Sequence, residues 1–203
     1  MDYSFLEKNK IVPVVILKKT EDTVPVLSAL KKGGINVAEI TFRTECAGEA
    51  IALAIKEFPD MTIGAGTVIN AEQCERAYSA GAKFIVSPGF SEDVLNICEK
   101  HGLPYLAGVV TPTEIITAKA HGLDVLKFFP AGVYGGAKAL KAVSAAFPGV
   151  KFVPTGGVDE TNLKEFLSLS CVAAVGGSFM FKGSIEEITA KSAQAVRIAE
   201  EML

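Results

Sequence analysis

The sequence predicts an α/β protein with a (β/α)8 TIM-barrel fold and a short N-terminal helix. From Lys10 onward, short runs of β-branched residues alternate with longer segments of helical period, which is typical of repeated βα units and a parallel sheet. The alternation repeats eight times without a linker. The chain has 203 residues, 49% of them hydrophobic, which is close to the lower length limit for an eight-fold barrel around one core. We therefore expect residues 1–203 to form a single TIM-barrel domain.

Each expected strand is a short run rich in β-branched or aromatic residues. The eight runs lie at residues 11–17, 37–41, 62–65, 84–87, 105–108, 125–128, 152–155 and 173–176. In a barrel of this kind, active-site residues come from the carboxyl ends of the strands and the loops that follow them. Functional residues are therefore expected at those ends.

Helices are expected in the intervals, at residues 23–32, 47–58, 71–80, 92–100, 112–120, 137–146, 160–168 and 185–202, with residues 2–9 as the leading helix. Asn70 and Ser91 are expected N-caps, as is either Thr111 or Thr113 for the fifth helix. Glycines follow several helices, where a connection to a strand needs positive φ. A doubly wound open sheet is the alternative, but no Gly-x-Gly-x-x-Gly follows the first strand.

The composition excludes several classes of protein. A net charge of -3 and a pI near 5.5 leave no basic surface for nucleic acid. The first ten residues lack the features of a signal peptide, and no apolar run reaches the ~20 residues of a membrane span. We expect a cytoplasmic protein that binds neither nucleic acid nor membrane.

The cysteines and histidines are not expected to take part in catalysis, disulfide bonds or metal binding. The four cysteines are widely spaced without a Cys-x-x-Cys pair, which indicates reduced core residues rather than disulfides or zinc ligands: Cys46, Cys74, Cys98 and Cys171. His101 and His121 each precede a glycine, as residues at helix ends do. No metal is expected, because no cluster of histidine or carboxylate ligands is present.

Lys127 lies near the carboxyl end of the sixth expected strand, in an apolar run closed by Pro130. A lysine in such a place is rarely left unpaired, because removing an ammonium group from water is costly. Two interpretations remain open. Lys127 is either a cation paired with a carboxylate for structural reasons, or a nucleophilic amine that forms a Schiff base.

The second expected strand carries two charged residues on one face. The period of two places Glu39, Thr41 and Arg43 together, opposite an apolar set that belongs against the helices. A carboxylate and a guanidinium inside a barrel are costly unless they serve each other or a ligand. A structural ion pair of Glu39 with Arg43 or with Lys127 is the alternative to a catalytic role.

Glycine-rich loops follow strands three, seven and eight. Gly66 precedes Thr67, where close packing and ligand approach explain the glycine equally well. The later loops hold two glycine pairs, Gly156-Gly157 and Gly176-Gly177, and residues 178–182 span about one helical turn. Barrels often bind phosphate between these two loops, so we predict a phosphate site there.

With these residues in place, the sequence resembles the class I 2-keto-3-deoxy-6-phosphogluconate aldolases, which often also cleave 4-hydroxy-2-oxoglutarate. The resemblance covers essentially the whole chain through the segments E-I-T-F-R-T, G-A-G-T-V, S-P-G, L-K-F-F-P-A, P-T-G-G-V and G-G-S. It implies a single aldolase domain over residues 1–203, a phosphorylated 2-keto acid as the small-molecule substrate, no cofactor and a homotrimer.

The resemblance also implies a role for each candidate residue. Lys127 would form the Schiff base, and Glu39 would shuttle protons. The other roles are carboxylate binding by Arg43 and Thr67, phosphate binding by Gly156, Gly157 and Ser178, and lining of the pocket by Pro88, Phe129 and Thr155. Relatives that act on the galactonate epimer tend to lack Thr155 and Arg43, which favours the gluconate substrate. Many relatives carry an arginine near the end of strand one, where this chain has Lys18-Lys19.

Two rival functions fit part of the pattern. A phosphosugar isomerase or epimerase could use the same phosphate site, and so could a barrel that binds a phosphosugar without turnover. Neither rival needs an amine inside the barrel, so Lys127 favours the aldolase.

Overall fold

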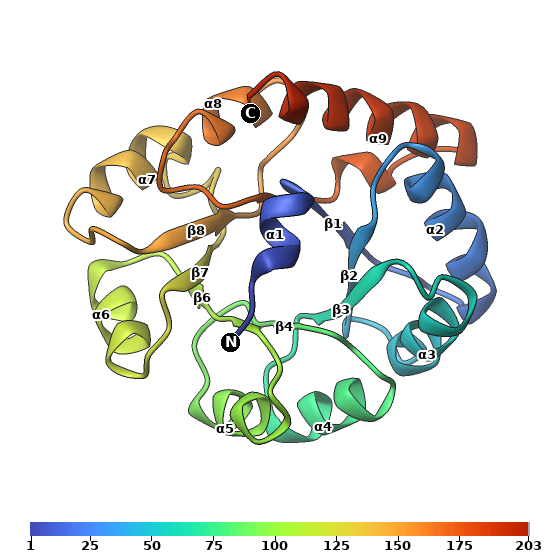
Figure 1. The fold of residues 1–203 in the computed structure, drawn as a ribbon, viewed down its shortest axis with the longest axis horizontal. Helices are drawn as coiled ribbons and strands as arrows, with labels where there is room; N and C mark the ends of the chain where they lie inside the picture. The colour runs from blue at the N-terminus through green and yellow to red at the C-terminus, as the bar shows by residue number, and fades with distance from the viewer. Residues whose placement is uncertain (203) are drawn as a thin grey trace.

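The computed structural model describes residues 1–202. Strands alternate with helices along the chain, and Figure 1 shows the helices as an outer ring around the strands. The strands are β1 (Ile11–Val15), β2 (Val37–Thr41), β3 (Thr62–Gly66), β4 (Ile85–Val86), β5 (Tyr105–Leu106), β6 (Gly108–Val109), β7 (Val125–Phe128), β8 (Lys151–Pro154) and β9 (Val175–Gly177). The helices are α1 (Ser4–Lys8), α2 (Thr23–Lys32), α3 (Ala47–Glu57), α4 (Ala71–Ser79), α5 (Glu92–His101), α6 (Pro112–Ala120), α7 (Gly136–Ser144), α8 (Leu163–Leu167) and α9 (Ile185–Glu200), with the short 3-10 helices η1 (Thr20–Asp22) and η2 (Phe179–Phe181).

The strands form two parallel sheets. Six strands in the order β5-β4-β3-β2-β1-β9 make one sheet, and three in the order β6-β7-β8 make the other. Ala107 alone separates β5 from β6, and isolated bridges of Phe152 with Val172 and of Thr155 with Gly176 link β8 to the segment around β9. The predicted α/β fold of parallel strands and alternating helices is confirmed.

The expected fifth strand, residues 105–108, is divided in two by the structure. β5 pairs with β4, whereas β6 pairs with β7. The chain changes partner at Ala107, whose carbonyl accepts a hydrogen bond from the Lys127 N–H at 2.9 Å. A change of pairing partner leaves no trace in the pattern of apolar residues, so the sequence predicted one strand.

The helix expected at residues 160–168 begins later than predicted, with α8 starting at Leu163. The Asp159 carboxylate accepts hydrogen bonds from the Thr161 N–H and hydroxyl, and the Asn162 side chain accepts one from the Asp159 N–H. Such local bonds compete with the first helical turn. The ends of the other expected strands and helices agree with the structure to within two residues.

The helix ends follow the predicted chemistry. Asn70 and Ser91 accept hydrogen bonds from the backbone N–H groups of α4 and α5, as N-caps do. Of the two threonines considered for α6, Thr111 is the cap, and it forms a reciprocal capping box with Glu114. The glycines that follow helices with positive φ are Gly34, Gly81, Gly102 and Gly122.

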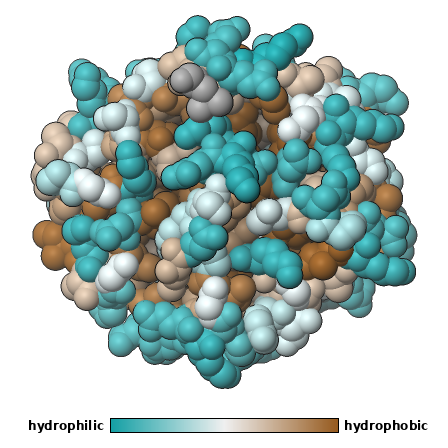
Figure 2. All heavy atoms as spheres, viewed as in Figure 1, coloured by the Kyte–Doolittle hydropathy of each residue, from teal (hydrophilic) through white to brown (hydrophobic). Residues whose placement is uncertain are grey.

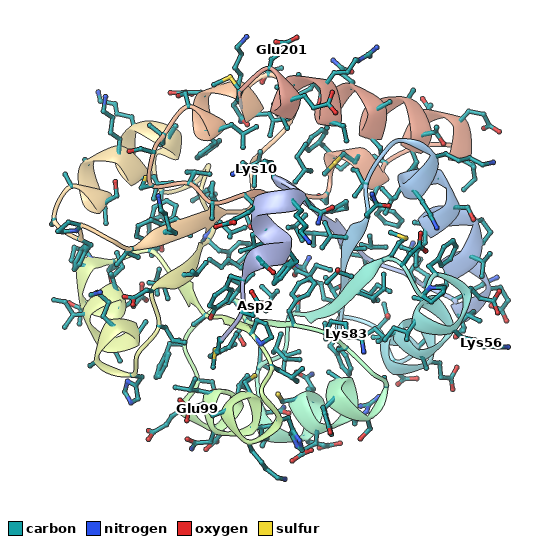
Figure 3. All side chains as sticks on the ribbon, viewed as in Figure 1. Asp2, Lys10, Lys56, Lys83, Glu99 and Glu201 are labelled. Carbon is teal, nitrogen blue, oxygen red and sulfur yellow. The ribbon has the colours of Figure 1, made fainter. Side chains whose placement is uncertain are left out.

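Helix α1 covers the amino ends of the strands. The Phe5 ring stacks on Phe84 with centroids 4.5 Å apart, and the Tyr3 hydroxyl donates to the Tyr105 carbonyl at 2.9 Å. Figures 1 and 3 show α1 at the centre of this face, with Asp2 and Lys10 at its two ends. The carboxyl ends of the strands, where functional residues are expected, therefore lie on the opposite side of the molecule.

Apolar side chains fill the space between strands and helices, and Figure 2 shows hydrophilic residues spread over the face that α1 covers. Among residues 1–202, no helix combines the length and apolar character needed to cross a membrane. Cys74 and Cys98 are buried with their sulfur atoms 3.8 Å apart, and Cys46 and Cys171 are half-buried.

Candidate active site

Lys127 lies in β7 and reaches across to β2. Only 3% of its surface is exposed, and its Nζ lies 3.5 Å from Oε1 of Glu39, which is 2% exposed. The same Nζ lies 5.0 Å from the centre of the Phe129 ring. Of the two ion pairs that the sequence left open for Glu39, the structure forms the one with Lys127.

Glu39 has room to reach Lys127 because a glycine stands beside it. Strands β2 and β3 pair in parallel with Thr41 opposite Gly66. A Cβ atom at Gly66 would overlap the Glu39 carboxyl group. The glycine therefore leaves room for the Glu39 carboxylate. Of the two explanations that the sequence left open for Gly66, the structure selects close packing, here against the Glu39 side chain.

Arg43 follows β2 and turns toward the neighbouring strand. Its Nε donates a hydrogen bond to the Thr67 hydroxyl at 3.1 Å. Thr67 has a φ of 56°. Among residues 1–202, every other residue with positive φ is a glycine. A β-branched residue in the left-handed region is strained, and such strain is concentrated at functional sites.

A cavity of about 190 Å³ opens at the carboxyl ends of the strands. It is lined by Val14, Arg43, Phe129, Thr155, Gly156, Gly157, Val158, Gly177 and Ser178. Gly156 and Gly157 have φ of 84° and 78°, so their backbone takes a path that side chains rarely allow. Arg43 is the cationic side chain of this lining.

Hydrogen bonds between loops hold the wall of this cavity. The Ala131 N–H donates to the Thr155 carbonyl, and the Gly132 N–H donates to the Gly156 carbonyl, both at 2.8 Å. Gly132 also packs directly on Gly157, where an added Cβ would lie 3.0 Å from the Gly157 Cα. The loop after β7 thus fixes the loop after β8, and with it the predicted phosphate-binding glycines.

Pro88 does not line the 190 Å³ cavity in this structure. It lies in the loop after β4, and its carbonyl packs where a Cβ at Gly108 would be. The buried Tyr105 holds this loop, since its hydroxyl accepts a hydrogen bond from the Ser91 N–H at 3.2 Å. Burial raises the pKa of Tyr105 to about 12, so the phenol stays protonated at neutral pH.

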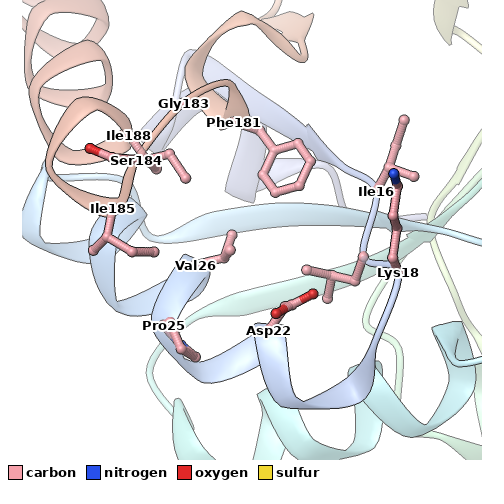
Figure 4. A pocket seen from close by; sticks show the side chains of 11 residues that line it. Ile16, Lys18, Asp22, Pro25, Val26, Phe181, Gly183, Ser184, Ile185 and Ile188 are labelled. Atoms are coloured by element: carbon pink, nitrogen blue, oxygen red, sulfur yellow. The ribbon is translucent and has the colours of Figure 1, made fainter.

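A second cavity, of about 370 Å³, lies between the β1–α2 connection and the η2–α9 segment. Figure 4 shows its mostly apolar walls, with Phe181 and Val26 near the centre and Lys18 at one edge. Lys18 lines this cavity and not the one around Arg43. Lys18, in the connection after β1, therefore lines a different cavity from the predicted phosphate-binding glycines.

The sequence assigned no role to Val14 and Val158, which line the 190 Å³ cavity together with Gly177 of the predicted glycine pair. Thr41 lies on the face of Glu39, and the sequence assigned it no role either. The period of two marked Thr41 as inward-facing, but no local pattern distinguished it from a packing residue. Among residues 1–202, no three histidine, cysteine, aspartate or glutamate side chains lie close enough to hold a metal ion.

These features define a class of protein. Parallel strands that carry a buried lysine–glutamate pair, together with a cavity that has an arginine and a glycine-lined wall, are typical of an α/β enzyme. The cavity lies at the carboxyl ends of the strands, where such folds place their chemistry.

The comparisons with known proteins identify the family. The sequence matches the family described as KDPG and KHG aldolase over residues 3–197. It is 43% identical over 202 residues to 2-dehydro-3-deoxy-phosphogluconate aldolase of Treponema pallidum, covering 97% of this chain and 96% of that protein. The chain belongs to the KDPG and KHG aldolase family, and is thus an aldehyde-lyase.

Solved structures agree with this assignment. The chain is 37% identical to the 2-keto-3-deoxy-6-phosphogluconate aldolase of Zymomonas mobilis with 3-phosphoglycerate, with a TM-score of 0.90 over 95% of this chain and 93% of that one. It is 38% identical to the KDPG aldolase of Legionella pneumophila with pyruvate captured at low pH as a covalent carbinolamine intermediate. There the TM-score is 0.87, over 98% of this chain and 96% of that one.

Proposed function

We propose that this chain cleaves 2-keto-3-deoxy-6-phosphogluconate to pyruvate and glyceraldehyde 3-phosphate through a Schiff base on Lys127. We include 4-hydroxy-2-oxoglutarate, cleaved to pyruvate and glyoxylate, as a second substrate. The observation that carries the proposal is the buried Lys127 amine 3.5 Å from the Glu39 carboxylate. The family, whose description joins both activities, and the pyruvate carbinolamine of the Legionella relative support it.

Lys127 begins the reaction as the nucleophile. Its neutral amine attacks the C2 ketone to give a carbinolamine, and Glu39 as a carboxylic acid protonates the departing hydroxyl. Water leaves, and a positively charged iminium remains on Lys127 beside the Glu39 carboxylate. The Phe129 ring, 5.0 Å from Nζ, presents its electron-rich face to this charge.

Cleavage then follows from the iminium. The C3–C4 bond breaks, its electrons form an enamine, and the C4 hydroxyl proton passes to Glu39 as the aldehyde is released. Protonation of the enamine at C3 and hydrolysis of the iminium release pyruvate and restore the amine. The proximity of Glu39 to Nζ supports its use in each proton transfer.

Substrate binding is divided between two groups of residues. We assign the pyruvyl carboxylate to Arg43 and Thr67, whose side chains are already joined at 3.1 Å, because a guanidinium can clamp a carboxylate with two parallel bonds. The phosphate is assigned to the cavity lined by Gly156, Gly157 and Ser178. Phe129 and Thr155 line the same cavity. We assign Pro88, in the loop after β4, to contact with the substrate from that side of the pocket.

Substitution of Gly66 by alanine should slow turnover by about 100-fold, because the added Cβ would overlap the Glu39 carboxyl and displace it from Lys127. Steady-state kinetics of pyruvate release would measure the loss. Gly48→Ala on α3 is the matched control, since no atom lies within 4 Å of its new Cβ. Equal activity of the two variants would contradict the role given to Gly66.

Borohydride trapping tests the proposed function directly. The protein is incubated with pyruvate and reduced, and the adduct is located by peptide mass spectrometry. We expect one reduced pyruvyl group, on Lys127, and none without pyruvate. If no lysine carries an adduct, the Schiff-base proposal is wrong, and isomerisation or simple binding of phosphosugars becomes the function to measure. The family assignment does not favour those two rivals.

We also propose that the strands close into a (β/α)8 barrel formed as one domain by residues 1–203. The short gap at Ala107 and the bridges between β8 and the segment around β9 support closure, as does the ring of helices in Figure 1. The homotrimer and the cytoplasmic location inferred from the sequence and the resemblance stay predictions. Analytical ultracentrifugation would measure the first, and cell fractionation the second.

A further inference from the structure

Three buried hydroxyl groups have no hydrogen-bond partner among residues 1–202: those of Thr23, Thr41 and Ser192. A buried polar group without a partner costs stability, so each one needs an explanation. Thr23 opens α2, and Ser192 of α9 packs against Gly33 after α2, so both belong to the outer helical layer. Thr41 is the exception, because it lies on a strand.

The Thr41 side chain faces the same space as Glu39. Residues two apart on a strand point to the same side, and Glu39 points to Lys127. Thr41 stands opposite Gly66, and the Glu39 carboxyl fills the place of a Cβ at Gly66. The Glu39 carboxyl group therefore lies at the same level along β2 as Thr41.

The position of Thr41 along β2 is equally informative. Glu39 and Lys127 form the inner end of the site, and Arg43 bonded to Thr67 forms the outer end. Thr41 ends β2, between Glu39 in the strand and Arg43 in the turn that follows, and lies about 7 Å from Glu39 along the strand at the usual rise per residue. A 2-keto acid with its C2 at Lys127 and its carboxylate at Arg43 would lie beside this hydroxyl.

We infer that the Thr41 hydroxyl is a further catalytic group, which donates a hydrogen bond to the oxygen atom that leaves C2 when Lys127 condenses with the keto acid. This inference rests on the proposed function. In that step the C2–O bond of the carbinolamine breaks, Glu39 gives its proton to the oxygen, and the products are water, the Lys127 iminium and the Glu39 carboxylate. The bond from Thr41 stabilises the oxygen while it carries the departing electrons.

The test compares Thr41→Val with Thr41→Ser. Valine keeps the shape and removes the hydroxyl, whereas serine keeps the hydroxyl. We measure the rate at which the protein forms a borohydride-trappable pyruvate adduct on Lys127, together with kcat, KM and Tm. We expect adduct formation about 10- to 100-fold slower in Thr41→Val and within about 3-fold of the unmodified protein in Thr41→Ser. We expect no fall of Tm in Thr41→Val, because it loses an unpaired buried hydroxyl.

Thr23→Val is the matched control, since it also removes a buried hydroxyl without a partner, in the helical layer. It should keep the rate of adduct formation. Thr41→Ala serves as a second variant without the hydroxyl should the valine disturb packing, and it too should be slow. Adduct formation at the unmodified rate in a folded Thr41→Val or Thr41→Ala protein would overturn the role of Thr41 alone. Failure of the unmodified protein to form any adduct would overturn the proposed function together with this inference.

Discussion

Replacement of Lys127 by alanine is expected to abolish cleavage, with a fall in kcat of about 10,000-fold or more, because the covalent intermediate can no longer form. No pyruvyl adduct should be trapped at position 127. The variant should remain folded, though less stable by about 3 kcal/mol, because Glu39 would lose its buried partner. Circular dichroism and thermal unfolding would measure this second effect.

Lys56→Ala is the control for the loss of a lysine in general. Lys56 lies on the outside of the helical ring, where its amine pairs with Glu57 at 3.6 Å and its side chain is largely exposed. Its removal should leave cleavage and trapping unchanged. Near-normal cleavage by Lys127→Ala would show that the reaction does not pass through an imine on this residue.

Replacement of Glu39 by glutamine should lower kcat by about 100- to 1,000-fold and change KM far less. The amide keeps the size of the side chain but cannot take or give the proton in carbinolamine dehydration and in cleavage. Because each of these steps needs a proton transfer at the C2 or C4 oxygen, the loss should fall on turnover. Steady-state kinetics with the phosphorylated substrate would separate the two constants.

Glu57→Gln is the matched control, since Glu57 pairs with Lys56 on the surface. Its kinetics should equal those of the unmodified protein. A Glu39→Gln variant whose KM rises while kcat is preserved would identify Glu39 as a binding group, and the proton transfers would then have to be assigned to another residue.

The fold could be read from the sequence almost element by element, because each cue was local. The caps at Asn70 and Ser91 and the apolar runs of the strands depend on residues a few positions apart, and the structure confirms them. For α6 the sequence left Thr111 and Thr113 open, and the structure selects Thr111. The late start of α8 and the division of the fifth strand were missed. Both depend on side-chain hydrogen bonds or on a change of pairing partner that periodicity does not record.

The candidate site, like the fold, was predicted only in part from the sequence. The sequence by itself determined that an amine and a carboxylate, Lys127 and Glu39, belong to the interior, because polar residues in apolar strands must face a shared space. It left open whether Glu39 meets Arg43 or Lys127. Only the tertiary structure decided that, since Lys127 lies 88 positions from Glu39 along the chain and 3.5 Å from it in space. Gly66, which has no side chain, leaves room for the Glu39 carboxyl group, while Arg43 bonds to Thr67.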